Sequence, residues 1–133
     1  MAPRQRALAA GCGAHIRQLL AAHPFDRNAW DCASAQDLHV RIGNARPAVG
    51  KDAALEELSR FFARIRSVGA GFCEMCHSGN TVFAEMEVEF SDAGGVHRRI
   101  PCVVVVRVEG RALLDVRLHL DPSPIPEPRA LAG

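Results

Sequence analysis

The sequence predicts an α+β domain, in which N-terminal helices pack on a mainly antiparallel sheet. Apolar residues in the first half recur at the spacing of amphipathic helices, whereas the second half alternates apolar and polar residues as strands do. Turns that contain glycine divide the second half into segments of strand length. The 133 residues are expected to form one domain over 1–133, with its core at about 14–125 and a tail at 126–133.

The first two expected helices are separated by a proline. An amphipathic helix ends near His23-Pro24, because proline disfavours helix at the residue before it. Its apolar positions are Ala7, Leu8, Ile16, Leu19 and Leu20. A short helix follows, with Asp26 as its N-cap and Trp30 within it.

The next expected elements are a strand, a turn-rich link and the clearest helix of the chain. Alternation at 38–42 places one face of the strand in the core. Residues 44–50 form the link, and the helix covers 50–68, with Asp52 capping its first turn and Gly69 following its end. The apolar stripe of this helix consists of Leu55, Leu58, Phe61, Phe62 and Ile65.

The second half is expected to form a meander of four strands. Residues 71–77 and 81–90 make a hairpin around a tight turn that contains glycine. The third strand covers 96–108 and carries Pro101 at a bulge. The fourth covers 112–121, so that consecutive strands can pair into one antiparallel sheet.

The period of two along each strand assigns the faces of this sheet. One face is apolar and is expected to pack against the helices. Its residues are Leu38, Val40, Ile42, Val82, Ala84, Met86, Val88, Phe90, Cys102, Val104, Val106, Val108, Leu114, Val116, Leu118 and Leu120. The opposite face carries a glutamate ladder at 85–89 beside Arg107, Arg117 and His119. Paired carboxylates can serve acid–base chemistry, but a solvated or subunit-facing surface with cross-strand ion pairs is the simpler interpretation.

The composition argues against two classes of partner. The net charge is +1, and the arginines are scattered with few aromatic residues among them, so a nucleic-acid surface is not expected. The longest apolar run, at 100–106, is far shorter than the ~18 residues of a membrane span. The N-terminal segment lacks the apolar stretch of a secretory signal. We therefore expect a cytoplasmic protein with neither nucleic acid nor a membrane as partner.

Cys73, Cys76 and His77 have the C-x-x-C-H spacing that attaches a c-type haem. Their segment is an expected strand, in which residues three apart point to opposite faces, so the two thiols cannot share a zinc ion. Haem attachment also needs export, for which no signal is visible. The chain has five cysteines, an odd number, and we expect them to be free thiols. No metal and no cofactor are expected.

Two short motifs carry a resemblance to a known family. They are a helix start that reads G-K-D-A at 50–53 and a segment that reads E-G-R-A-L-L-D-V-R at 109–117, followed by Asp121-Pro122. In this order, over about 16–125, they resemble the nuclear transport factor 2-like superfamily, with its SnoaL-like polyketide cyclases, ketosteroid isomerases and limonene epoxide hydrolases. The resemblance implies a cone-shaped α+β barrel, with a strongly curved sheet around a pocket, and a homodimer through the outer sheet face.

The residues that carry the chemistry of these families are mostly replaced here. Ketosteroid isomerases need an aspartate base where this chain has Arg41, and a tyrosine in the oxyanion hole, whereas this chain contains no tyrosine. Epoxide hydrolases use an arginine and an aspartate where this chain has Met86 and Val88, and a second aspartate where it has Leu118. Their asparagine is retained as Asn44.

Two functions remain open. In the first, a small and mostly apolar molecule binds in the cone pocket without catalysis. The residues expected to line the pocket are Trp30, Ile42, Phe61, Phe62, Met86, Val88, Val104, Val116 and Leu118. In the second, the chain is a small isomerase, cyclase or dehydratase for a polyketide- or steroid-like substrate, with His119 or Asp121 as the acid or base. Asn44 is a further candidate, as a donor or acceptor toward the ligand.

Overall fold

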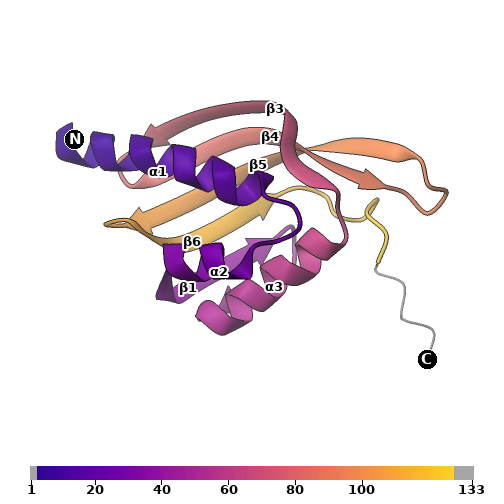
Figure 1. The fold of residues 1–133 in the computed structure, drawn as a ribbon, viewed down its shortest axis with the longest axis horizontal. Coiled ribbons are helices and arrows are strands. Elements are labelled where there is room, and N and C mark those ends of the chain that lie inside the picture. Colours follow the sequence, from indigo (N-terminus) through magenta and orange to yellow (C-terminus); the bar gives the residue numbers. More distant parts are fainter. Residues whose placement is uncertain (1–2, 128–133) are drawn as a thin grey trace.

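The computed structural model describes residues 3–127, without the side chains of 3–11 and 70–72, and it divides them into helices and strands (Figure 1). The helices are α1 (Pro3–Ala21), α2 (Arg27–Ala33) and α3 (Lys51–Ala63). The strands are β1 (Ser34–Ile42), β2 (Ala48–Val49), β3 (Ser67–Ser78), β4 (Thr81–Ser91), β5 (His97–Glu109) and β6 (Ala112–His119). This order of elements confirms the predicted α+β class. No helix in the described part of the chain is long and apolar enough to cross a membrane.

All of these strands belong to one sheet, in the order β2-β1-β6-β5-β4-β3. The pairs from β6 to β3 are antiparallel, and so is the β1–β2 pair, while β1 runs parallel to β6. Figure 1 shows a strongly curved sheet, with α1 lying across β3 and β4 and α3 beside β1. The parallel pair brings the carboxyl ends of β1 and β6 to the same end of the sheet. Two loops leave the sheet side by side at this end.

The helix starts show which capping predictions hold. The Asp26 side chain accepts a hydrogen bond from the Ala29 N–H at 3.1 Å and caps α2 as expected. The N-cap of α3 is Gly50, with φ 95° and no side-chain hydrogen bond, so the predicted capping by Asp52 is wrong. Asp52 instead lies in the first turn, where a carboxylate is stabilised by the helix dipole. Gly69 does not follow α3 but lies within β3.

The predicted apolar face of the sheet is the core of the molecule. In β4 every second side chain, from Val82 to Phe90, is at most 2% exposed. The same holds for Cys102, Val104 and Val106 in β5. Each large side chain buried in this way contributes about 1.5–3 kcal/mol to stability. Helix α3 covers this face with Ala54, Leu55, Leu58, Phe61 and Phe62.

Two details of the meander differ from the prediction. The pairing of β5 with β6 shifts register after Arg107, so Leu113 is buried and Leu114 is partly exposed, the reverse of strict alternation. No bulge occurs at Pro101, which pairs in unbroken register with Glu87. Because β6 pairs with β5 only from Val103 onward, β5 has no second neighbour at the proline, and a missing N–H is tolerated there.

The link before α3 also holds the short strand β2, which alternation could not predict.

Candidate functional site

The C-x-x-C-H segment lies in β3 and places its two cysteines on opposite faces, as predicted. Cys73 pairs with Met86 on the inner face, while Cys76 pairs with Phe83 on the outer face. All of the cysteines are free thiols. In residues 3–127, no three histidine, cysteine, aspartate or glutamate side chains are grouped so as to hold a metal ion. Burial raises the pKa of the Cys102 thiol to about 12, so this thiol stays protonated and unreactive.

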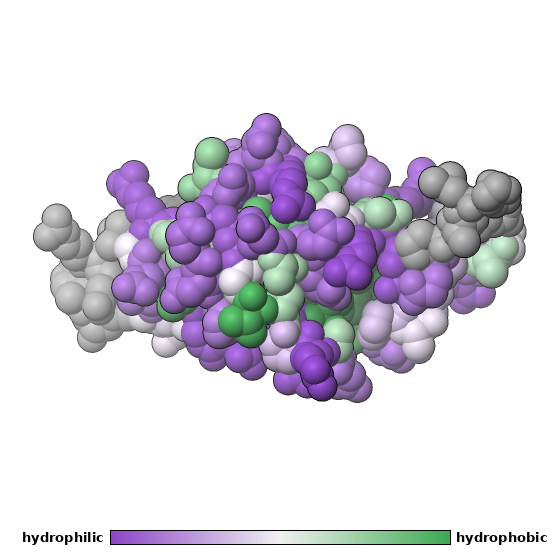
Figure 2. All heavy atoms as spheres, turned by 90° about the horizontal axis from the view of Figure 1, so that it is seen from below, coloured by the Kyte–Doolittle hydropathy of each residue, from purple (hydrophilic) through white to green (hydrophobic). Residues whose placement is uncertain are grey.

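A groove of about 730 Å³ lies beside the ends of β1 and β6, between α3 and the chain that follows β6. Its floor is apolar and consists of Ile42, Phe61 and Ile125, each at most 5% exposed. The other lining residues are Asn44, Ala45, Glu57, Arg60, Arg64, Asp121, Pro122, Ser123, Pro126 and Glu127. Figure 2 shows that the surface on the side of α2 and α3 is mainly hydrophilic, with hydrophobic residues in small separate spots. The apolar floor is therefore recessed below a polar rim.

One wall of the groove is the C-terminal segment, residues 120–127, which Arg64 fastens to α3. The Arg64 Nη2 group donates to the Ile125 carbonyl at 2.8 Å, and its Nε donates to the Pro126 carbonyl at 3.2 Å. Arg64 also pairs with Glu127 at 3.3 Å. Ile125 is 2% exposed and belongs to the hydrophobic core. A polar clasp and an apolar anchor thus hold this wall in place.

The other end of the C-terminal segment is held by contact with the loop after β1. The Gly43 N–H donates to the Leu118 carbonyl at 2.9 Å. A Cβ atom at Gly43 would lie 3.0 Å from Pro122 Cδ, and the residue has φ 58°. Only glycine suits both the left-handed backbone and this close approach. The two loops at the end of the sheet are therefore packed against each other.

The charges on the rim are largely paired. Arg60 lies 3.7 Å from Glu57, and Arg64 is held by Glu127. Asp121 has no ion pair within the described part of the chain, but its Oδ1 accepts a hydrogen bond from the Ser123 N–H at 3.0 Å. The backbone N–H and the hydroxyl of Ser123 lower the pKa of Asp121. This carboxylate therefore stays ionised and is not a proton donor near neutral pH.

The structure brings together part of the predicted site. Asn44 and Asp121 both line the groove, and so do Ile42 and Phe61 from the predicted pocket. His119 does not line this groove and is exposed on the outer face, beside a smaller cavity that Leu118 also lines. The other predicted lining residues are core side chains at most 1% exposed, and they do not line the groove: Trp30, Phe62, Met86, Val88, Val104 and Val116. Their role in a pocket stays a prediction.

Trp30 has an unusual environment for a core residue. Its ring lies among aromatic rings, 6.1 Å from Phe25 and 6.3 Å from Phe62 between centroids. In the described part of the chain its Nε1 is the one buried side-chain polar atom without a hydrogen-bond partner. Such a donor is costly to leave unpaired. The predicted role of Trp30 in a pocket stays a prediction, since its ring lies in the core and lines neither cavity.

Several groove residues had no sequence signal of function. Arg64 follows the end of α3, where a basic side chain is ordinary for capping reasons. Ile125 is a single apolar residue between Pro124 and Pro126, without any period. Glu57 and Arg60 belong to the charged face of an amphipathic helix. Only the burial of Ile125 and the hydrogen bonds of Arg64 mark these residues as parts of one site.

Comparisons with known proteins identify the fold. No family model and no curated protein matches the chain. A solved protein from Jannaschia sp. CCS1, described as a SnoaL-like polyketide cyclase, has a TM-score of 0.74 at 14% identity, with 96% of this chain and 97% of that one covered. A protein from Xanthomonas campestris pv. campestris, described as a polyketide cyclase, has a TM-score of 0.69 at 18% identity, with 90% and 94% covered. An epoxide hydrolase of the limonene type from M. tuberculosis has a TM-score of 0.69 at 16% identity, with 91% and 88% covered.

Proposed function

We propose that this protein, which has the cone-shaped nuclear transport factor 2-like fold, binds a small and mostly apolar molecule in the groove at the ends of β1 and β6. The observation that carries the proposal is the recessed floor of Ile42, Phe61 and Ile125 within a cavity of about 730 Å³. Small-molecule sites are typically concave and apolar, with a few polar groups that orient the ligand. Asn44 and Asp121 on the rim supply such groups.

The paired rim charges favour a neutral ligand. Arg60 and Arg64 are engaged with Glu57 and Glu127, so neither is free to attract an anion strongly. Asp121 remains as an acceptor at the edge of the groove. A neutral ring system with one hydroxyl or carbonyl group fits this distribution, because its apolar part covers the floor and its polar group reaches the rim.

Binding is better supported than proton transfer. Ser34 is the one buried polar residue of the described part, and its hydroxyl already donates to the Trp30 carbonyl at 2.6 Å. A general acid or base works best with a pKa near the working pH. The pKa of Asp121 moves the opposite way, downward, and the Cys102 thiol stays protonated.

A fluorescence titration with Nile red, a neutral apolar dye, tests the binding proposal. Ala45→Phe places a bulky ring in the groove at an exposed position outside the core. We expect it to weaken dye binding about tenfold or more. Ala93→Phe, the same change in the exposed β4–β5 turn, is the matched control and should bind as the parent protein does. Equal binding by parent and Ala45→Phe would refute the site.

The second candidate function is a small isomerase, cyclase or dehydratase, and one observation favours it. Asp121 and Asn44 both line the groove, where an ionised carboxylate could act as a base beside an amide. Exchange of the α-protons of α-tetralone in deuterium oxide measures such base activity by mass spectrometry. We expect no exchange above the rate in buffer. If the parent protein accelerates this exchange and Asp121→Asn does not, the protein is an enzyme and the proposal of binding without catalysis is wrong.

We also propose a homodimer through the outer face of the sheet. The expected cross-strand ion pair is present at Glu89, which lies 2.8 Å from Arg99. Glu85 and Glu87 have no ion pair in the described residues. Their partners on β5 are Val103 and Pro101, which carry no charge. An acidic area on β3 and β4 is thus separated from a basic area around Arg107 on β5. The apolar residues between them are Phe83, Val103 and Val105, of which the first two are more than a third exposed.

A two-fold axis through this apolar strip would place each acidic area against the basic area of the second copy. Sedimentation velocity tests this arrangement. Glu85→Lys combined with Glu87→Lys should shift the equilibrium to monomer, and the further change Arg107→Glu should restore part of the dimer. A parent protein that remains monomeric at micromolar concentrations would exclude the dimer.

A further inference from the structure

We propose that the outer face of the sheet holds a second binding site, for a small oxyanion such as a phosphate group. The site is a cavity of about 180 Å³ at the ends of β1 and β6. Its lining residues are Arg41, Gly43, Asn44, Arg117, Leu118 and His119. It goes beyond the proposed apolar groove, with which it shares Asn44 alone. A volume of this size suits one oxyanion group rather than a nucleotide or a peptide.

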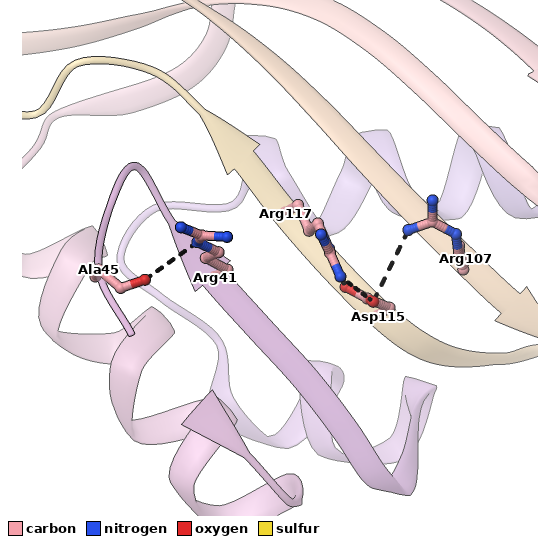
Figure 3. A network of polar contacts seen from close by, with 5 residues as sticks. All are labelled: Arg41, Ala45, Arg107, Asp115 and Arg117. Carbon is pink, nitrogen blue, oxygen red and sulfur yellow. Dashed lines mark hydrogen bonds and ion pairs between the residues drawn. The ribbon is translucent and has the colours of Figure 1, made fainter. Parts of the chain in front are cut away.

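The arginines of this site stand in a repulsive arrangement. Arg41 and Arg117 are directly opposite each other in the parallel pairing of β1 with β6. Figure 3 shows their guanidinium groups on the same side of the sheet, with Arg107 and Asp115 beyond them. Like charges in directly opposite positions destabilise a sheet, so strand pairing does not explain this pair. An anion bound between them would offset that cost.

The donors of the two guanidinium groups are only partly used. The Arg41 Nε donates to the Ala45 carbonyl at 3.2 Å, which leaves both Nη groups without a partner within residues 3–127. Arg117 donates from Nε and Nη2 to the two carboxylate oxygens of Asp115, at 3.2 and 3.3 Å, which leaves its Nη1 (Figure 3). Both side chains are thus held in place while they still offer N–H groups.

The local charge balance favours an anion. Asp115 is the carboxylate that contacts Arg117, and it also lies 3.8 Å from Arg107. One carboxylate therefore serves the guanidinium groups of Arg107 and Arg117, Arg41 has no ion pair within residues 3–127, and no carboxylate lines the cavity itself. Guanidinium groups bind planar and tetrahedral oxyanions through paired N–H donors. The Asn44 amide and the His119 ring add N–H donors at the rim.

Isothermal titration with inorganic phosphate, at constant ionic strength in chloride buffer, tests the proposal. We expect saturable binding that Arg41→Gln and Arg117→Gln each weaken about tenfold or more, since a hydrogen bond to a charged group is worth roughly that factor. Arg111→Gln removes an exposed arginine at the other end of β6 and should leave binding unchanged. A parallel titration with phenyl phosphate shows whether the site takes a free phosphate ion or the phosphate group at the end of a larger molecule. Saturable binding of inorganic phosphate or of phenyl phosphate supports the site.

Three results would overturn the proposal. Phosphate could give no more heat than added chloride, or all three glutamine variants could bind it equally. Alternatively, Arg41→Gln and Arg117→Gln could alter only the monomer–dimer equilibrium, which would assign these arginines to carboxylates of a second copy. Arg41→Lys and Arg117→Lys, which keep the charge and lose the paired donors, serve where a glutamine variant fails to fold by circular dichroism. They should bind phosphate more weakly than the parent protein.

Discussion

The two faces of the sheet differ in what they do with charge. The inner face holds apolar side chains at almost complete burial, and its fully buried thiol, that of Cys102, is inert. The outer face carries ionisable side chains in two areas of opposite sign, separated by the partly exposed Phe83 and Val103. The same strands build both faces, because alternate residues of a strand point to opposite sides of the sheet. One set of residues therefore packs in the core, and the other set carries the charges.

This difference indicates where function can be located on such a fold. No charged side chain is buried among the described residues, and we therefore propose that binding takes place where the strands end. Both cavities lie at the end where β1 and β6 stop, one floored by Ile42 and the other by the arginine pair. In both proposed sites the sheet would serve as the frame, and the two loops would supply contacts to the ligand.

The largest expected effect contrasts one phenylalanine from each face. Phe62→Ala should destabilise the protein by about 3–5 kcal/mol, because it opens a cavity in the core. Phe83→Ala, on the outer face and 37% exposed, should cost less than about 1 kcal/mol. Urea unfolding at low protein concentration measures both values without a contribution from dimerisation. Similar losses for both variants would show that the two faces are packed alike.

A smaller effect is expected where the two loops meet. Gly43→Ala meets both a left-handed backbone and a contact at 3.0 Å with Pro122, so we expect a loss of about 2–3 kcal/mol. Gly95→Ala meets a positive φ of 81° but open space, and should cost about 1–2 kcal/mol. Thermal unfolding gives the order of the two. If Gly95→Ala were the more harmful, the close packing of the loops would be refuted.

The smallest effect concerns a partly buried carboxylate at the surface. The Arg98 guanidinium, with the N–H groups of Val96 and Gly94, lowers the pKa of Asp92 from its ordinary 3.8. The stability that this carboxylate contributes is present above pH 3.8 and is lost as the pH falls through its lowered pKa. Urea midpoints at several acidic pH values should therefore fall less steeply in Asp92→Asn than in the parent.

Asp37→Asn is the control for this pH series. Asp37 is exposed, and its side chain makes no hydrogen bond among the described residues. It should keep the steepness of the parent protein. If Asp92→Asn kept that steepness too, Asp92 would not be held by Arg98 in solution.

The sequence predicted those parts of the fold that depend on local periodicity. Alternation from Val82 to Phe90 identified the inner face, and the Asp26 cap identified the start of α2. It could not predict the bulge at Leu114, because a register shift depends on the partner strand. The sequence also could not show that Asp52 does not cap α3. The N-cap is Gly50, which has no side chain to reveal this role.

The candidate site was less predictable because its parts are distant in sequence. Alignment to known families brought out Asn44 and Asp121, both of which line the groove. It did not bring out Arg64 and Ile125, whose meaning depends on hydrogen bonds and packing across about sixty residues. Strand period placed His119 on the outer face, where it lies beside Arg117 rather than in the groove.

We expect a small apolar molecule to bind at the ends of β1 and β6 and not within the packed interior. A titration of the isotope-labelled protein with α-tetralone, followed by amide chemical shifts, tests this claim most directly. We expect saturable shifts at Asn44, Ala45 and Ser123, with those of Val104 and Val116 unchanged. Shifts concentrated at Met86, Val104 and Val116, with none at the loops, would contradict it.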